Sequence, residues 1–331
     1  MLFIEPKSFD AAFHFATEEF CMNHFPQDTT IWMLWRTKKC IMLGSNQIPG
    51  LEIDMQAADK HGVQIVRRPS GGGTIFTDPG TIQYTVIMPF KQEMDVKQVE
   101  RKVLAAAMLR VINGSLGLPA KLEGRNDITL AGRKISGLAQ HIQNGRLCSH
   151  GSLLYDTDLD ILTEVLNPGD DKIKSKSIRS VRSRVTSLKS HLPAPMEIDD
   201  FFDYLKQDWM TYHNMEEYVL AEADIAAINK IRLEKYANND WTYGKTPKFT
   251  YHNRVKYDMG IVEVFLTIEK GMIRDCSING DFLSVLPITK LQETITGLAY
   301  QREVIDAALT KINVSPYLGG ITHEQLLNTL F

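Results

Sequence analysis

The sequence predicts an α/β protein with two domains: a large domain whose mixed sheet is flanked by helices, and a small carboxy-terminal α+β domain. The chain has 331 residues, which at roughly 150 residues per domain is enough for about two domains with their own cores. Strand-like and helix-like patterns alternate along most of its length. Turn-forming residues at 244–247 precede a stretch, 260–268, that alternates like a strand. We therefore expect a large domain at 1–243 and a small one at 244–331.

Hydrophobic periodicity predicts the individual elements. Apolar residues recur at helical spacing in four stretches, which are 9–24, 96–112, 199–214 and 221–236. Short strands are expected at 31–36, 40–43, 63–67, 83–88, 127–130, 134–143 and 146–154. Asn144 and Gly145 form the strongest short signal for a hairpin between the last two of these strands. The final stretch, 287–330, is mostly helical in pattern.

Composition excludes several classes of protein. Hydrophobic residues make up 44% and charged residues 23%, so the chain is neither disordered nor coiled-coil in character. Its formal net charge of -3 argues against a general nucleic-acid binder. The amino-terminal residues lack the apolar core of a signal peptide, and no run approaches the roughly 18 apolar residues of a membrane span. We expect a cytoplasmic protein with no membrane and no nucleic-acid partner.

The four cysteines do not suggest a metal site or a disulfide framework. Cys21, Cys40, Cys148 and Cys276 lie far apart, and no two of them form a C-x-x-C pair. Free thiols of this kind fit a reducing compartment.

A glycine cluster that follows a predicted strand is the first candidate site. It reads R-R-P-S-G-G-G-T-I-F at 67–76. Three successive glycines let backbone amides approach a ligand and form an anion-binding nest, and the arginines could pair with phosphate or carboxylate oxygens. The cluster matches neither of the common phosphate-binding glycine motifs. The alternative is a plain turn between two strands.

Two further segments carry candidate polar groups on the predicted hairpins. Lys134 would aim an ammonium at an anion, and Asn126 and Asp127 offer the oxygen ligands that suit Mg²⁺. Alternatively, these are exposed hairpin charges and turn residues. His150, beside Gly151, would either polarise a ligand or satisfy a hydrogen bond in the core.

A basic segment lies between residues 172 and 189. It holds seven lysines and arginines and no acidic residue. One interpretation is a solvated arm that contacts nucleic acid. The other is a loop that closes over a reactive intermediate and shields it from water.

In this order, these segments resemble the lipoate-protein ligase A family, including its bacterial members with a C-terminal accessory domain. The family motifs correspond to R-R-x-S-G-G-G-x-I-F, G-R-N-D-I, K-I-S-G-x-A, H-G-S-L-L, N-P and S-V-R-S-R-V-T-x-L. In this chain they lie at 67–76, 124–128, 134–139, 150–154, 167–168 and 180–188. The resemblance continues into the carboxy-terminal part at 241–247 and 280–282.

The resemblance implies a fold, a reaction and partners. The fold would be a biotin/lipoate ligase-like catalytic domain, similar to class II synthetase cores. The enzyme would use ATP and Mg²⁺ to convert lipoate into lipoyl-AMP. It would then transfer the lipoyl group to a lysine of an apo lipoyl domain, in an acyltransferase subunit of a 2-oxoacid dehydrogenase or in the glycine-cleavage H protein. We expect a monomer.

The resemblance also assigns site residues. Lys134 would be the catalytic residue, bridging the lipoate carboxyl group and the α-phosphate, and Asn126 and Asp127 would hold the metal. The residues expected to bind ATP or the adenylate are Arg68, Ser70, Gly71, Gly72, Gly73, Thr74, Ile75, Phe76, Thr77, Lys134, Ser136, Gly137, Arg182 and Arg184. Those expected to bind lipoate are Phe15, Glu18, Trp35, Arg68, Gly73, Lys134, His150 and Gly151.

The chain departs from the family pattern at three places. Thr77 stands where many members have His, Thr81 where they have Asn, and His14 where Asn is frequent. Substrate or nucleotide affinity would then differ from the family norm. The preferred acceptor, the choice between lipoate and octanoate, and any need for a partner protein or an amidated intermediate stay open.

Three other functions compete with the ligase. A cysteine-dependent octanoyl or lipoyl transferase of the same fold would need a nucleophile, and Cys148 is the candidate with Lys134 as its activating cation. A packed thiol is the alternative interpretation of Cys148. A biotin ligase lacks support because its glycine-arginine loop is absent. A non-catalytic lipoyl-domain binder is suggested only by Thr77 and Thr81.

Overall fold

A computed structural model describes residues 1–124, 126–166, 184–194, 196–244 and 249–331. The strands are β1 (Leu2–Ile4), β2 (Ile31–Trp35), β3 (Cys40–Leu43), β4 (Gln64–Arg67), β5 (Ile75–Thr77), β6 (Thr81–Pro89), β7 (Lys121–Glu123), β8 (Asp127–Leu130), β9 (Arg133–Gln143), β10 (Arg146–Leu154), β11 (Glu216–Glu217), β12 (Tyr251–Tyr257), β13 (Gly260–Glu269) and β14 (Met272–Gly280). The α-helices are α1 (Ala11–His24), α2 (Pro49–Glu52), α3 (Met55–Lys60), α4 (Val96–Val99), α5 (Ala106–Leu109), α6 (Leu159–Val165), α8 (Ile198–Tyr212), α9 (Glu222–Ile231), α10 (Asn239–Tyr243), α11 (Thr289–Ile295), α12 (Arg302–Leu309) and α13 (His323–Thr329). The π-helical segments are η1 (Glu100–Ala105), η2 (Arg110–Ser115) and η4 (Arg232–Tyr236), and η3 (Lys189–His191) is a 3₁₀ turn.

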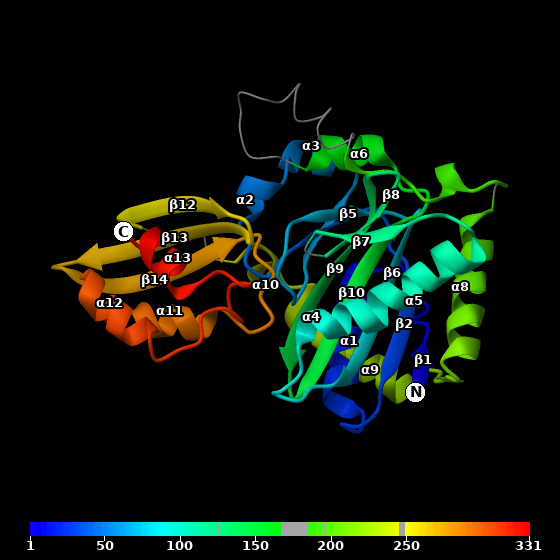
Figure 1. The fold of residues 1–331 in the computed structure, drawn as a ribbon, viewed down its shortest axis with the longest axis horizontal. Coiled ribbons are helices and arrows are strands. Elements are labelled where there is room, and N and C mark those ends of the chain that lie inside the picture. The colour runs from blue at the N-terminus through cyan, green and yellow to red at the C-terminus, as the bar shows by residue number, and fades with distance from the viewer. Residues whose placement is uncertain (125, 167–183, 195, 245–248) are drawn as a thin grey trace.

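An eight-stranded mixed sheet forms the centre of the large domain (Figure 1). Its strand order is β11-β1-β2-β6-β10-β9-β8-β7. Strand β1 runs parallel to both of its neighbours, and the other pairs are antiparallel. A second sheet, β4-β3-β5, carries the start of the glycine cluster at the end of β4. The predicted α/β class, with its mixed sheet, is confirmed.

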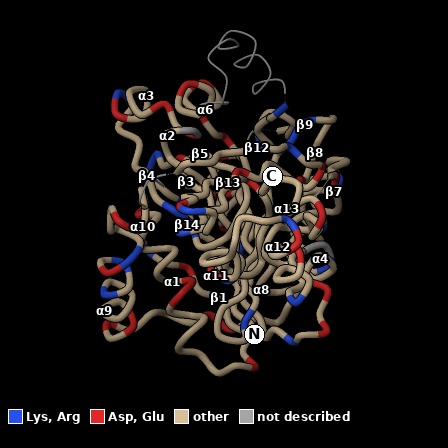
Figure 2. Tube along the Cα trace, turned by 90° about the vertical axis from the view of Figure 1, so that its left-hand side faces the viewer, with Lys and Arg blue, Asp and Glu red and all other residues tan. Residues whose placement is uncertain are grey.

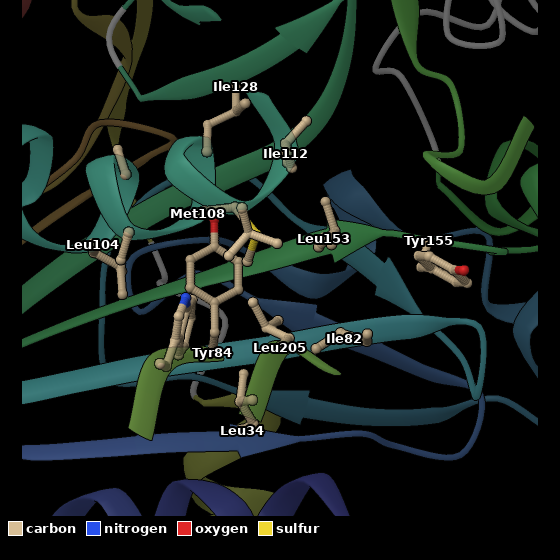
Figure 3. Packing of buried hydrophobic residues seen from close by; sticks show 14 of the residues in the cluster. Leu34, Ile82, Tyr84, Leu104, Met108, Ile112, Ile128, Leu153, Tyr155 and Leu205 are labelled. Atoms are coloured by element: carbon tan, nitrogen blue, oxygen red, sulfur yellow. The ribbon is translucent and has the colours of Figure 1, made fainter. Parts of the chain in front are cut away.

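Helices cover both faces of the large sheet. On one face, α8 and the helical segment 96–115 bury a cluster that includes Trp209 and Met108. Figure 3 shows Leu104, Met108 and Ile112 of that segment directed at Tyr84 and other sheet residues. On the other face, α1, α9 and η4 pack against apolar side chains of β2, β3 and β10. The candidate site lies on this second face.

The helix expected at 96–112 is present, with a different internal form. It runs on to residue 115, and two of its four segments, η1 and η2, are π-helical. A helical pattern of apolar residues shows that one face is buried, but it does not report a widened turn within the helix.

Several short elements carry no signal that sequence periodicity would detect. Strands β1 and β11 have three and two residues, and α2 and α10 have four and five. Elements this short are stabilised by their neighbours and not by a pattern of their own.

The carboxy-terminal part, 249–331, has its own core. Strands β12, β13 and β14 form an antiparallel sheet, and helices α11 to α13 pack against it. The stretch 287–330, expected to be mostly helical, contains these three short helices separated by turns and loops. Figure 1 shows this α+β unit, in yellow to red, beside the large domain. The exact boundary at 243–244 stays a prediction.

The two parts of the chain are joined by backbone hydrogen bonds close to the glycine cluster. The amide of Gly72 donates to the carbonyl of Phe282 at 3.0 Å, and the amide of Gly280 donates to the carbonyl of Asn46 at 2.8 Å. The side-chain amide of Asn46 also donates to Ser284 Oγ at 3.0 Å. A loop of the small domain, 280–285, therefore lies directly against the glycine cluster.

Charged residues of both signs are mixed over the face shown in Figure 2. No helix in the described ranges is long and apolar enough to cross a membrane.

An ionisable side chain lies partly buried at the junction of the two domains. Burial raises the pKa of Glu52 to about 7, and the charge of Asp281 acts in the same direction. Glu263 adds to this effect, whereas Gln47 and Arg254 oppose it. Because the folded pKa exceeds the ordinary value of 4.5, the unfolded chain ionises first. Stability contributed by this group is present at acidic pH and is lost as the pH rises from about 4.5 through 7.

We predict that Glu52→Gln stabilises the protein at pH 8, by roughly 1 kcal/mol, and has a smaller effect at pH 5. The amide keeps the shape of the side chain and removes the charge that becomes unfavourable at high pH. Thermal unfolding at both pH values measures the difference. Asp59→Asn, which removes an exposed carboxylate from the neighbouring helix α3, is the matched control. An equal effect of Glu52→Gln at the two pH values would contradict the prediction.

Candidate active site

A cavity opens between the second face of the large sheet, helix α1 and the glycine cluster. Its walls come from strands β2, β3, β5, β6, β9 and β10, from α1, and from the small domain. The lining residues are Phe15, Trp35, Met42, Arg68, Gly72, Gly73, Thr74, Ile75, Gln83, Asn126, Lys134, Gly137, Leu138, Ala139, His150, Gly151, Ser152 and Leu283.

Strand register explains why residues distant in sequence meet here. Trp35 pairs with Gln83, Gln83 with Ser152, and Ser152 with Gly137, so one row crosses four strands. Cross-strand partners lie on the same face of a sheet. The row therefore ends with Trp35 at one side of the cavity and with Gly137, under Lys134, at the other.

A β-bulge brings Lys134 into this row. The register of β8 and β9 shifts between Ile128 and Thr129, so that Ile128 pairs with Ser136 and Thr129 with Lys134. Ser136 Oγ hydrogen-bonds Tyr84 Oη on the opposite face, whereas Lys134 and Gly137 both line the cavity. In a regular strand, residues three apart point to opposite faces. The extra residue places the lysine and the glycine on one face.

Lys134 lies over Gly137. A Cβ at Gly137 would stand 2.8 Å from Lys134 Nζ, so a side chain at this position would displace the ammonium from the place that it occupies. The same nitrogen pairs with Asp127 Oδ1 at 2.7 Å, and the lysine side chain is 34% exposed. A fixed cation therefore faces the cavity with one oxygen partner.

Arg68 shapes the glycine loop, residues 70–74. Its Nη2 donates to the carbonyls of Gly71 and Gly73, both at 2.8 Å, and its Nη1 donates to the carbonyl of Met42 at 2.9 Å. Nε donates to Ser70 Oγ at 3.1 Å. Burial lowers the pKa of Arg68 to about 10, so the side chain is still charged at neutral pH. The guanidinium holds the loop in shape at the cavity wall.

The position of Gly72 requires a residue without a side chain. Its φ of 93° lies in the left-handed region that favours glycine. A Cβ there would also stand 2.9 Å from Leu283 Cδ2 of the small domain. The small domain thus closes the cavity over the glycine loop.

Arg67 is bound to a different set of carbonyls. It donates to the carbonyls of Gly44, Gln47 and Thr242 at 2.9, 2.7 and 2.8 Å. It does not line the cavity. Of the two arginines that precede the glycines, Arg67 therefore ties β4 to α10 and to the loop after β3.

His150 stands between two buried partners. Its Nε2 lies 2.6 Å from Ser70 Oγ, and its Nδ1 lies 3.1 Å from Glu18 Oε2. Glu18 is fully buried and also accepts a hydrogen bond from Thr85 Oγ1 at 2.6 Å. Burial acts to raise the pKa of Glu18, but hydrogen bonds from His150 and Thr85 act in the opposite direction, and the pKa is lowered.

Most of the expected site residues meet at this cavity. Those that line it are Phe15, Trp35, Arg68, Gly72, Gly73, Thr74, Ile75, Asn126, Lys134, Gly137, His150 and Gly151. Those that do not line it are Glu18, Ser70, Gly71, Phe76, Thr77, Asp127, Ser136 and Arg184. Three of these residues contact lining residues without lining the cavity themselves. Glu18 and Ser70 do so through hydrogen bonds, and Asp127 does so through an ion pair. Arg182 and most of the basic segment lie outside the described residues, and so does the Asn-Pro pair at 167–168.

Two expected nucleotide contacts lie elsewhere in the fold. Phe76 is buried in a separate apolar cluster beneath α6, and Thr77 Oγ1 hydrogen-bonds Thr37 Oγ1 at 2.8 Å. Both follow the glycine loop on β5, where they pack away from the cavity.

Six lining residues were not expected from the sequence. They are Met42, Gln83, Leu138, Ala139, Ser152 and Leu283. Gln83 and Ser152 could have been found from strand alternation, since they share a face with Trp35 and His150. Leu283 could not, because its place depends on how the small domain packs.

Two departures from the family pattern are accommodated by buried hydroxyl contacts. Thr81 Oγ1 donates to Asp78 Oδ1 at 2.9 Å and lies 2.8 Å from Thr157 Oγ1. Thr77 and Thr37 form the similar pair described above. Both threonines therefore have structural partners, and neither lines the cavity.

Asn126 and Asp127 offer oxygen atoms of the kind that Mg²⁺ prefers, and the carboxylate of Asp127 is paired with Lys134 Nζ at 2.7 Å. One carboxylate and one amide oxygen are hard donors of the kind that Mg²⁺ prefers, and the ion usually completes its shell with substrate phosphates and water. Among the described residues, the one group able to hold a metal without a substrate is Glu18, Cys148 and His150.

The cysteines give no support to thiol chemistry. All four are buried. Burial raises the pKa of Cys148 well above its usual value, and the charge of Glu18 adds to that effect. A thiol in this environment stays protonated at neutral pH and is a poor nucleophile.

Two family models match the chain. Residues 10–209 match the lipoyl protein ligase A/B catalytic domain, and residues 246–330 match the bacterial lipoate protein ligase C-terminus. A lipoate-protein ligase of Bacillus subtilis is 34% identical, with all of both chains covered. Lipoate–protein ligase 1 of Staphylococcus aureus is 30% identical, with 97% of both chains covered.

Two solved structures share the fold. LipL1 of P. falciparum, in complex with lipoate, has a TM-score of 0.78 at 20% identity and covers 95% of this chain and 94% of its own. A bipartite lipoate protein ligase of Thermoplasma acidophilum has a TM-score of 0.66 at 25% identity and covers 76% of this chain and 98% of its own. The family expected from the motifs is thus confirmed: the chain belongs to the lipoate-protein ligases, enzymes that form an amide bond.

Proposed function

We propose that this chain activates lipoate with ATP as lipoyl-AMP and transfers the lipoyl group to a lysine of an apo lipoyl domain. The observation that carries the proposal is the ammonium of Lys134, held over Gly137 at the polar side of a cavity whose other side is apolar. The names of the relatives support it. So does a solved lipoate-protein ligase with bound ATP, which shares the fold with a TM-score of 0.62.

The cavity suits a carboxylic acid with an apolar tail. Phe15, Trp35, Met42 and Ile75 provide apolar wall, and Lys134 offers a charge for the carboxylate. The tail would therefore lie toward Trp35 and Phe15, and the acid group toward Lys134.

The first chemical step joins two anions. A lipoate carboxylate oxygen attacks the α-phosphorus of ATP, the bond to the β-phosphate oxygen breaks, and pyrophosphate leaves. Lys134 lowers the barrier because its charge is already in place where negative charge accumulates. Arg68 contributes by holding the glycine loop, whose amides would face the phosphate or acid oxygens.

The second step forms the amide. The amine of the acceptor lysine attacks the carbonyl carbon of the mixed anhydride, AMP leaves, and the amine gives up a proton.

Asn126 and Asp127 would hold Mg²⁺ together with the phosphates. The ion, when bound, would neutralise phosphate charge during the first step.

The proposal also covers the acceptor protein, the compartment and the oligomeric state. The acceptor would be an acyltransferase subunit of a 2-oxoacid dehydrogenase or the glycine-cleavage H protein, and the enzyme would act as a cytoplasmic monomer. The solved archaeal ligase supports an acceptor of this kind, since it was studied with its E2 lipoyl domain.

The function is tested by incubating the purified chain with Mg-ATP, lipoate and several apo lipoyl domains. We expect at least one domain to gain the mass of one lipoyl group, with formation of pyrophosphate and AMP. If no domain gains mass and no lipoyl-AMP forms, the proposed function is wrong.

We predict that Lys134→Ala leaves the fold intact and slows adenylation by at least ~100-fold, the scale of losing one preorganised charge. Pyrophosphate release in a lipoate-dependent assay measures the rate. Arg133→Ala removes the exposed neighbouring cation and should have near-normal activity. A Lys134→Ala enzyme with a normal rate would refute the role of this ammonium.

We also predict that Cys148→Ser keeps ATP-dependent lipoylation within a few-fold of the starting protein. Since burial keeps the Cys148 thiol protonated, this residue has no covalent part in the reaction. Loss of activity with retained folding, together with a lipoyl thioester on the starting protein, would instead favour the cysteine-dependent transferase.

A further inference from the structure

A chain of buried hydrogen bonds runs behind the cavity from one wall to the other. It begins at Trp35, whose Nε1 donates to Thr85 Oγ1 at 3.2 Å, and Thr85 Oγ1 donates to Glu18 Oε1 at 2.6 Å. At the other wall, Arg68 Nε donates to Ser70 Oγ at 3.1 Å. Ser70 and Glu18 are joined by His150, which touches both of them.

The direction of every bond in this chain follows from its ends. An ionised carboxylate only accepts, so the His150 nitrogen that faces Glu18, Nδ1, must carry a proton. Ser70 is fully buried, and among the described residues the acceptor within reach of its hydroxyl proton is Nε2 of His150, at 2.6 Å, so Nε2 is unprotonated. All the donors point toward Glu18, and each group in the chain is satisfied.

Three members of the chain line the cavity, and three stand behind it. Trp35, Arg68 and His150 contribute to the walls. Glu18, Ser70 and Thr85 have no exposed surface at all. The carboxylate of Glu18 is therefore in contact with the groups that orient the walls, without reaching the cavity itself.

We propose that Glu18 is a positioning residue for the acyl pocket. Its buried carboxylate sets the tautomer of His150, and through Ser70 and Thr85 it fixes Arg68 and Trp35 on opposite walls. The inference rests on the proposed function only for its kinetic consequence. It differs from the expectation that Glu18 contacts lipoate directly.

Glu18→Gln is the sharpest variant, because it keeps the size of the side chain and replaces one of its two acceptor oxygens with an NH₂ group, which donates. A glutamine can accept from Thr85 or from His150, but its amide nitrogen then faces the other donor. The amide oxygen should keep the shorter bond, the one from Thr85 at 2.6 Å, so that the amide nitrogen faces Nδ1 of His150. The His150 ring would then change its tautomer or turn, and the hydroxyl of Ser70 would lose its acceptor. The walls would loosen without the loss of any atom that lines the cavity.

The test has a spectroscopic part that needs no substrate. Nitrogen-15 correlation spectra of histidine-labelled protein, with the His150 signal assigned from a His150→Asn variant, report which ring nitrogen is protonated. We expect Nδ1–H in the starting protein and a different protonation pattern in Glu18→Gln. A starting protein with a protonated Nε2, or an unchanged pattern in the variant, would overturn the proposal.

The kinetic part separates positioning from chemistry. We expect Glu18→Gln to raise the KM for lipoate at least ~10-fold, and to have a smaller effect on transfer from lipoyl-AMP supplied ready-made. Glu19→Gln is the matched control, since Glu19 follows on the same helix and binds Lys235 and Tyr236 away from the cavity. Equal KM values for the two variants would overturn the proposal.

A second variant covers the case in which Glu18→Gln does not fold. Ser70→Ala removes the hydrogen bonds of Ser70 to Arg68 and to His150 and keeps the link from Glu18 through Thr85 to Trp35. It should raise the KM for lipoate while leaving Nδ1 of His150 protonated. An unchanged KM in Ser70→Ala would also count against the proposal. If the starting protein forms no lipoyl-AMP at all, the proposed function fails, whereas the histidine spectra still decide the role of Glu18.

Discussion

The pocket depends on an ammonium held over a residue that has no side chain. Lys134 reaches the cavity only because a β-bulge in β9 turns it to the same face as Gly137. Without the extra residue, the lysine would point to the other side of the sheet, where Ser136 meets Tyr84. An irregularity of one residue in one strand thus decides whether the site has its cation.

The arginines around the glycine loop are used to hold backbone in place. Arg67 and Arg68 are both buried and donate mainly to carbonyl oxygens. Buried guanidinium groups are costly unless their donors are satisfied, and carbonyl groups satisfy them here. The carbonyls of Gly71 and Gly73 are thereby occupied by Arg68. Beneath the cavity, a chain of hydrogen bonds that ends at Glu18 holds side chains of the walls in place in a similar way.

The small domain takes part in the site as well as in the architecture. Leu283 lines the cavity, and the carbonyl of Phe282 accepts from the amide of Gly72. A loop amide is thus engaged by the small domain in this arrangement. Glu52 lies at the same junction, where Asp281 and Glu263 of the small domain act to raise its pKa and Arg254 acts to lower it.

Sequence alone determined the fold class, the long strands and helices, and the segments that carry the chemistry. The glycine cluster, Lys134 and His150 were all identifiable, because their signals are local and depend on neighbouring residues. Tertiary structure decided the rest. Glu18 contacts His150 rather than the cavity, Thr77 turns into the core, and Leu283 arrives from another domain, because strand register and domain packing bring together residues that no local pattern connects.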